Sequence, residues 1–292
     1  MRDGRRIGTH AAADTTPAML VREMVGHDLP DRPPDRERAP GEVALRVTGL
    51  HAGERVCGVN LEVRCGEILG IAGGSGSGKS VLLKTLIGLH RPDSGEVLFN
   101  GKSIESLGAT EKAALIGVLF QQGALFSSLS VVQNVMLPMR EHTALPVNEQ
   151  ERLATIKLEL AGLSGDNALK FPSELSGGMV KRAALARALA LDPRILFLDE
   201  PTSDLDSLTA SGIDDLILKL NQSLGITVVI VTHDLNTLFN ICDRVAMLVD
   251  KKIVVDTVDK LMSSDEPWIH ELLHSPRAQG AIYARKSGHG IG

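Results

Sequence analysis

A glycine-rich stretch that ends in lysine and serine is the part of this sequence best equipped for chemistry. It fits the pattern G-x-x-x-x-G-K-[ST] of phosphate-binding loops. Glycine permits the positive φ angles that turn successive backbone N–H groups toward an anion. The lysine adds a positive charge for the β- and γ-phosphates, and the final serine offers a hydroxyl to Mg²⁺. We therefore expect nucleotide phosphates to be bound by Gly73, Gly74, Ser75, Gly76, Ser77, Gly78, Lys79 and Ser80.

The residues on both sides of this loop favour the same interpretation. Residues 67–72 are typical of a short buried strand, and residues 81–87 are typical of a helix whose N-terminus would face an anion. The alternative, a glycine-rich turn without a ligand, is disfavoured because the loop, its Lys-Ser pair and both flanks agree.

Two acidic residues follow a second apolar run. Asp199 and Glu200 come directly after residues 195–198, which read as a buried strand. Beside a phosphate loop, Asp199 would hold Mg²⁺ and Glu200 would polarise an attacking water as a general base. The simpler interpretation is a pair of polar residues that merely ends a strand.

A second glycine-containing segment has the character of another phosphate site. Residues 175–179 read Leu-Ser-Gly-Gly-Met and open an alanine-rich helix. Glycines at a helix start expose N–H groups, and Ser176 adds a hydroxyl. One nucleotide does not need two γ-phosphate sites in one chain. We therefore expect Ser176, Gly177 and Gly178 to serve a nucleotide held by another copy.

Alternating strand and helix patterns predict an α/β fold with a mainly parallel sheet. In such sheets ligands bind beyond the carboxyl ends of the strands. Three strands would bring the phosphate loop, Asp199 with Glu200, and His233 to one edge. Residues 44–47 and 59–63 alternate apolar and polar, which predicts an antiparallel β subdomain. Helical spacing predicts an inserted helical subdomain at about residues 125–186.

Composition narrows the class of protein. The chain has 292 residues and a net charge of −5, and aromatic residues make up 3%, so nucleic acid is not an expected partner. No apolar run has the length needed to cross a bilayer, and we expect no secretory signal. The three cysteines lack metal-ligand spacing and suit a reducing cytosol.

The order of the motifs resembles that of the ATP-binding subunits of ABC transporters, over about residues 43–257. The matching segments are residues 73–80, Gln121, residues 175–179, Asp199 with Glu200, residues 203–206 and His233. The resemblance implies a P-loop NTPase (RecA-like) domain over residues 43–257. From their own composition, which is charged and broken by prolines, residues 1–41 are expected to form a disordered polar tail, and residues 258–292 are expected to form a C-terminal helical tail.

The resemblance also implies roles for individual residues. Ser176, Gly177 and Gly178 would contact ATP across a head-to-tail dimer. Gln121 would join Ser80 and Asp199 at Mg²⁺, sense the lytic water and link the site to the membrane subunit. His233 would hold the γ-phosphate, and Asp206 would connect the two sites of the dimer. The catalytic set is therefore Glu200, His233 and Gln121.

A narrower resemblance is to the ATPases of Mla-type lipid-transport systems. Residues 119–126, 137–142 and 173–187 are similar to that subgroup, as are Met179 and residues 250–252. It implies movement of phospholipids or other hydrophobic molecules across the bacterial envelope. The implied partners are a second copy, a multi-span permease and an MCE-type substrate-binding protein. The chain would sit at the cytoplasmic face of the inner membrane, in contact with the membrane through the permease.

Two features of the sequence stand apart from this interpretation, and one alternative function stays open. The aromatic residue that usually stacks on adenine is missing from residues 47–51, where Leu50 or His51 would have to replace it. Residues 270–274 read His-Glu-Leu-Leu-His, which matches the zinc-protease pattern H-E-x-x-H. A short helix and the lack of an evident third ligand favour a tail helix that docks on the core or on a sister subunit. A non-transport ABC ATPase that regulates cell division or envelope remodelling remains the alternative function.

Overall fold

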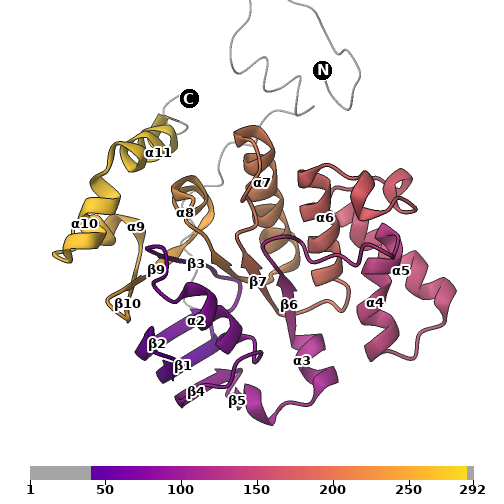
Figure 1. Cartoon of the computed structure of the whole chain (residues 1–292), viewed down its shortest axis with the longest axis horizontal. Helices are drawn as coiled ribbons and strands as arrows, with labels where there is room; N and C mark the ends of the chain where they lie inside the picture. Colours follow the sequence, from indigo (N-terminus) through magenta and orange to yellow (C-terminus); the bar gives the residue numbers. More distant parts are fainter. Residues whose placement is uncertain (1–40, 288–292) are drawn as a thin grey trace, which may run out of the picture. The chain divides into compact units, whose positions relative to one another are not determined.

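The computed structural model describes residues 41–287 (Figure 1). One compact unit spans residues 38–282. The other comprises residues 1–37 and 283–292, of which the structure describes only 283–287, the end of helix α11. The tail predicted for residues 1–41 lies outside the described residues except for Gly41, so it stays a prediction.

A six-stranded sheet forms the centre of the larger unit, in the order β10-β9-β3-β8-β7-β6. Five neighbouring strands run parallel, and only β10 pairs antiparallel, with β9. The strands are β3 (Ile68–Gly73), β6 (Ile116–Leu119), β7 (Ile195–Asp199), β8 (Thr227–Val231), β9 (Arg244–Val249) and β10 (Lys252–Asp256). The predicted mainly parallel sheet is confirmed.

A separate antiparallel sheet has the order β2-β1-β4-β5. Its strands are β1 (Val43–Ala52), β2 (Val56–Arg64), β4 (Ser94–Phe99) and β5 (Lys102–Ser103). Helix α2 (Lys79–Leu86) follows the phosphate loop and buries Leu82, Leu83 and Leu86 in the core cluster that also contains residues of this sheet. The antiparallel subdomain therefore packs directly behind the phosphate loop.

Successive residues of the central strands point to two different cores. On β7, Ile195 and Phe197 join the cluster shared with α2, whereas Leu196 and Leu198 join the cluster on the opposite face. That second cluster contains residues of α7 (Ser207–Leu224) and α8 (Leu235–Ile241). Both faces of β7 are covered, which explains its uninterrupted apolar sequence.

A third core belongs to the inserted helices. It contains buried residues of α4 (Val131–His142), α5 (Val147–Leu160) and α6 (Gly177–Ala188). Helix α3 (Ala109–Leu115) precedes β6, and the short 3-10 turns are η2 (Ile104–Ser106), η3 (Gly165–Asn167) and η4 (Pro172–Glu174). The predicted α/β fold with an antiparallel β subdomain and an inserted helical subdomain is confirmed.

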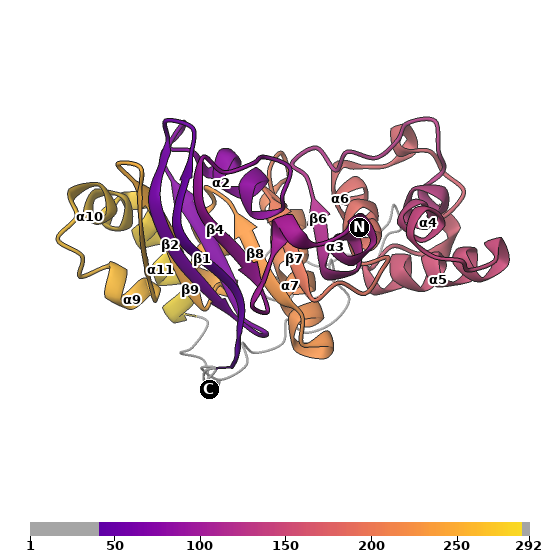
Figure 2. The same cartoon turned by 90° about the horizontal axis from the view of Figure 1, so that it is seen from below.

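The chain after β10 forms α9 (Val258–Leu261), α10 (Pro267–His274) and α11 (Pro276–Ser287). Leu261, Ile269 and Leu273 are buried in the core cluster that α7 and α8 form with one face of the central sheet. Helices α9 and α10 and the inserted helices lie at opposite ends of the central sheet in both views (Figures 1 and 2). Within residues 41–287, none of the helices combines the length and apolar character that crossing a bilayer requires.

Candidate nucleotide site

The carboxyl ends of four neighbouring parallel strands bring the predicted residues to one edge of the sheet. Asp199, the last residue of β7, pairs in register with Val231, the last residue of β8. The backbone N–H of Glu200 donates to the Val231 carbonyl at 2.8 Å. His233 follows β8 by two residues, and Gln121 follows β6 by two residues. Sheet pairing alone therefore gathers residues that lie far apart in the sequence.

The phosphate loop leaves β3 and turns into α2 through residues that require glycine. Gly76 has a φ of 75°, and Gly78, which precedes the first turn of α2, has a φ of 109°. A Cβ on Gly73 would stand 2.7 Å from both the Leu248 carbonyl oxygen and the Ser77 hydroxyl. Position 73 therefore requires glycine because β9 approaches closely. Positions 76 and 78 require glycine because the turn there needs a positive φ.

Two polar side chains of the loop fit an anionic ligand. Lys79 Nζ donates to the carbonyl oxygens of Gly73 and Gly74 at 2.8 and 3.0 Å. Burial lowers the pKa of Lys79, and the nearby carboxylates of Glu200 and Asp199 oppose that shift. Ser77 Oγ is buried and has no hydrogen-bond partner within the described residues. A buried hydroxyl without a partner is costly, so the loop is shaped for a group that supplies one.

Glu200 lies at the edge of the sheet with its carboxylate held by β8. Its φ of 47° is unusual for a residue other than glycine and turns the chain sharply after β7. One carboxylate oxygen lies 2.9 Å from His233 Nδ1, and the other accepts from the Thr232 hydroxyl at 3.4 Å. Two of the three predicted catalytic side chains, Glu200 and His233, are therefore in direct contact.

Asp199 and Ser80 supply oxygen atoms suited to a magnesium ion. Burial raises the pKa of Asp199, the Glu200 carboxylate raises it further, and Lys181, Lys84 and Lys79 act in the opposite direction. The Ser80 side chain is exposed at the start of α2. A carboxylate and a hydroxyl are the hard oxygen donors that Mg²⁺ prefers, so the residues present fit that ion.

Lys181 is a residue that sequence reasoning missed. It is only 5% exposed, on α6. Its Nζ donates to the backbone carbonyl of Gln121, to that of Glu200 at 2.9 Å and to the Ser203 hydroxyl at 3.2 Å. One buried ammonium thus ties the helical subdomain to the segments after β6 and β7.

Arg187, two turns further along α6, holds the same segment after β6. Its guanidinium donates to the carbonyl oxygens of Gly123 and Ala124 at 2.8 and 2.7 Å. The signal for both cations was present in the sequence. They interrupt an alanine-rich helix, and a cation on a buried helix face must find oxygen partners elsewhere.

The turn between β1 and β2 also reaches the loop. The Arg55 guanidinium donates to the Gly76 carbonyl, and a Cβ on Gly78 would stand 2.9 Å from Arg55 Cβ. Of the two candidates for adenine, Leu50 is 0% exposed, whereas His51 is exposed with its Nδ1 2.9 Å from the Gly49 carbonyl. Leu50 cannot stack on a base, so His51 is the candidate that the fold leaves available.

The second predicted phosphate segment is not brought to the loop of its own chain. Ser176 caps α6, where its hydroxyl accepts from the Met179 N–H at 3.3 Å. A Cβ on Gly177 or Gly178 would stand closest to Leu205 or Thr209, at 3.3 and 2.5 Å. In Figures 1 and 2, β6 lies between α2 and α6. The residues closest to the start of α6 are therefore Leu205 and Thr209 of the same chain rather than residues 73–80.

Asp206 has a structural role within the chain. Its carboxylate caps α7 and accepts from the Leu208 and Thr209 N–H groups at 3.1 and 3.0 Å and from the Thr209 hydroxyl at 2.6 Å. These hydrogen bonds, that of the Thr209 hydroxyl foremost, lower the pKa of Asp206. The segment that carries it lies beside the start of α6.

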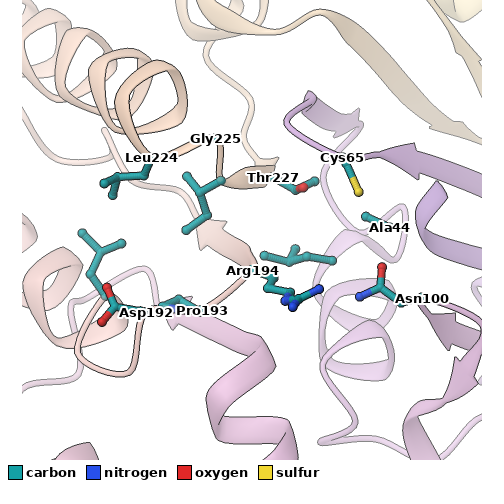
Figure 3. A pocket seen from close by; sticks show the side chains of 12 residues that line it. Ala44, Cys65, Asn100, Asp192, Pro193, Arg194, Leu224, Gly225 and Thr227 are labelled. Carbon is teal, nitrogen blue, oxygen red and sulfur yellow. The ribbon is translucent and has the colours of Figure 1, made fainter. Parts of the chain in front are cut away.

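A cavity of about 340 Å³ opens at the opposite end of the strands (Figure 3). It lies where β7 and β8 begin, and Arg194, Asn100, Cys65 and Thr227 are among its lining residues. It is distinct from the strand-end site, because the phosphate loop and both acidic residues are at the carboxyl ends.

His270 and His274 of the H-E-x-x-H segment stack on each other, with ring centroids 4.0 Å apart. His274 Nδ1 lies 2.9 Å from the His270 carbonyl oxygen. In the part of the chain that the structure describes, no three His, Cys, Asp or Glu side chains are grouped to hold a metal ion.

A phosphate loop between β3 and α2, with two carboxylates and a histidine at neighbouring strand ends, defines a P-loop nucleotide hydrolase. Sequence comparison gives the same class. A family model described as ABC transporter matches residues 56–203. The "Probable ribonucleotide transport ATP-binding protein mkl" of Mycobacterium leprae is 42% identical over 248 residues, which cover 82% of this chain and 71% of that protein.

A second relative is the "Intermembrane phospholipid transport system ATP-binding protein MlaF" of Haemophilus influenzae. It is 43% identical over 220 residues, which cover 73% of this chain and 83% of that protein. Among solved structures, the dimeric post-hydrolysis state of the ATP-binding cassette MJ0796 bound to ADP and Pi superposes with a TM-score of 0.67 at 34% identity. That match covers 73% of this chain and 98% of the cassette.

The chain belongs to the ABC transporter family, as an ATP-binding subunit that hydrolyses ATP. Cassettes of this family dimerise and work with permease subunits. The predicted family and enzymatic activity are confirmed.

Proposed function

We propose that residues 73–80 bind the phosphates of ATP and that Glu200 activates the attacking water. Lys79 exchanges its two loop carbonyls for phosphate oxygens, and Ser77 Oγ gains the partner that it lacks within residues 41–287. Ser80, Asp199 and Gln121 would hold Mg²⁺, which would supply positive charge to stabilise the transferred phosphate. His233, which touches Glu200, turns to the γ-phosphate.

Each reaction centre is completed by a second copy of the chain. The support is that Ser176 caps a helix that opens with Gly177 and Gly178, whose closest neighbours are Leu205 and Thr209 rather than their own phosphate loop. A helix N-terminus favours an anion. In a head-to-tail dimer this N-terminus meets the γ-phosphate bound by the partner's loop, and Asp206, beside it, lies at the interface. Hydrolysis removes that phosphate and releases the two copies.

Adenine stacks on His51. The ring is exposed at the end of β1, and the turn that follows carries Arg55 to the phosphate loop. Base stacking on an aromatic ring is worth about 1–3 kcal/mol, so His51→Ala should raise the KM for ATP about tenfold. His51→Tyr should keep or lower it. An unchanged KM in His51→Ala would remove this residue from the base site.

The proposed cargo is phospholipid or another hydrophobic molecule of the bacterial envelope. The observation that carries it is the 43% identity with a protein named as the ATPase of intermembrane phospholipid transport. The partners are a multi-span permease and an MCE-type substrate-binding protein, with the chain peripheral on the cytoplasmic face of the inner membrane. Motion reaches the permease through Gln121, whose segment is bound by Lys181 and Arg187 of the helical subdomain.

Purification of the tagged full chain from its native membranes tests this proposal. We expect a multi-span permease and an MCE-type protein to co-purify. ATPase activity of that complex should rise when it is moved from detergent into phospholipid nanodiscs. The relatives named for ribonucleotide transport supply a second candidate. Stimulation by ribonucleotides but not by phospholipid would favour it, and capture of cell-division proteins without a permease would contradict transport altogether.

A further inference from the structure

The C-terminal helix α10 places the chain's single tryptophan against the phosphate loop. A Cβ built on Gly74 would stand 3.8 Å from Trp268 Cζ2 and 3.9 Å from its Nε1. These are van der Waals distances, so the indole edge lies next to the backbone of the second loop residue. Trp268 lies well beyond residues 56–203, the segment that the family model matches.

The ring is fixed in this place by the docking of α10. Pro267 opens the helix, and the Glu266 carboxylate caps it by accepting from the Ile269 N–H at 2.9 Å. Ile269 and Leu273 are both 0% exposed in the core cluster, which also contains Met247 of β9. Trp268 itself is half-buried against that cluster. The helix is therefore held before Trp268 by the Glu266 cap and after it by the burial of Ile269 and Leu273.

The contact touches a peptide that takes part in the binding step. The Gly74 carbonyl accepts from Lys79 Nζ at 3.0 Å. When phosphates occupy the loop, Lys79 leaves this carbonyl, and the Gly74 peptide keeps the hydrogen bond that its carbonyl accepts from the Ser77 N–H at 3.1 Å and its packing against Trp268. The indole is the side chain that packs there, and its N–H makes no hydrogen bond within residues 41–287.

We propose that Trp268 is a positioning residue for ATP binding. It holds the Gly74 peptide in the conformation that receives the phosphates, so the C-terminal helix contributes to nucleotide affinity without touching the nucleotide. The proposal rests on the nucleotide site proposed above. It gives the segment after the ATPase core a role in the first step of the reaction.

Intrinsic fluorescence of the full chain provides a direct test, because all indole emission comes from Trp268. Titration with Mg·ADP should change the emission with the same midpoint that calorimetry gives for binding. The change should persist in Ser176→Arg, which blocks the dimer contact but leaves the loop intact. Lys79-dependent binding without any change in emission would overturn the role of Trp268. If Lys79→Ala bound ADP as tightly as wild type, the proposed nucleotide site itself would fail.

Variants separate the loop contact from the docking of the helix. Trp268→Ala should raise the KM for ATP about fivefold with kcat within about twofold, because it removes ground-state binding. Trp268→Phe keeps a flat ring and should stay near wild type. Leu272→Ala is the matched control, because Leu272 packs on the same core one turn further along α10. An equal rise in KM for Leu272→Ala, or no rise for Trp268→Ala, would overturn the proposal.

Discussion

The strand-end edge and the start of α6 are both suited to bind phosphate, but they are built in different ways. At the strand ends, β3, β8, β7 and β6 lie side by side, and their pairing brings the loop, Asp199 with Glu200, His233 and Gln121 together. At the start of α6, one helix turn offers its own N–H groups and the Ser176 hydroxyl, and the nearest neighbours are Leu205 and Thr209.

This difference shows which half of the chemistry a single chain can complete. The strand-end edge has a lysine, two carboxylates and a buried hydroxyl without a partner within residues 41–287, and the proposed hydrolysis would use all of them. The start of α6 offers backbone N–H groups and the Ser176 hydroxyl, which accepts from the Met179 N–H. Lys181 joins the two regions, since it belongs to α6 and donates to the carbonyls of Gln121 and Glu200.

The largest expected change in kcat comes from a substitution at the strand-end edge alone. Glu200→Gln keeps the side-chain shape but removes the general base, so kcat should fall by about 100-fold to 1,000-fold while ATP still binds. Size-exclusion chromatography with ATP should then show a trapped dimer. The matched control is Glu271→Gln, an exposed carboxylate on α10, which should leave turnover unchanged. Full activity in Glu200→Gln would remove that residue from its role.

Complementation tests whether the two regions meet between copies. Lys79→Ala and Ser176→Arg should each be nearly inactive alone, because both sites of either dimer are defective. In a mixed dimer one site carries both defects and the other carries neither, so mixing should restore activity. The measurement is ATPase rate against the mixing ratio, with a maximum near equal amounts. A mixture as inactive as its components would mean that α6 does not complete the partner's site.

Lys181 tests the connection between the regions within one chain. Lys181→Met removes the ammonium that joins α6 to the Gln121 and Glu200 carbonyls and to the Ser203 hydroxyl, so we expect kcat to fall about tenfold, equivalent to about 1.4 kcal/mol. Lys181→Arg keeps the charge and should retain most activity. The KM for ATP should change little, because Lys181 does not donate to the phosphate loop. A large rise in KM with normal kcat would contradict this assignment.

The smallest expected effect lies outside both regions. Asp214 of α7 bonds the Thr237 hydroxyl of α8 at 3.0 Å, and burial raises the pKa of Asp214 to about 8. The folded protein keeps this proton at neutral pH, whereas the unfolded chain loses it above about pH 4. The free energy of unfolding should therefore fall between about pH 4 and pH 8.

Asp214→Asn removes this loss of stability. Its Tm should exceed that of the wild type by about 3 °C at pH 8 and should differ little near pH 4. Differential scanning fluorimetry across this pH range measures the difference, with Asp215→Asn as the neighbouring control. ATPase activity should be unaffected, which would separate α7–α8 packing from both phosphate-binding regions. A Tm difference independent of pH would show that Asp214 does not titrate in this way.

Much of the fold and of the strand-end edge could be predicted because the signals are local. Residues 73–80 form a contiguous motif, and Asp199 with Glu200 follows its strand directly. Strand register carries these local motifs to a common edge. The contacts of Lys181, Arg55 and Trp268 could not be predicted, because each joins segments whose distance depends on packing between helices and sheets.

The positions of the main strands along the chain, the phosphate loop and the acidic pair could be read from the sequence itself, because backbone geometry and apolar periodicity act over a few residues. Side-chain partners were decided only by the tertiary structure. Glu200 meets His233, Leu50 is buried while His51 stays exposed, and α10 docks on the core beside Gly74. These outcomes depend on how the surfaces of separate elements fit together, and no short stretch of sequence carries that information.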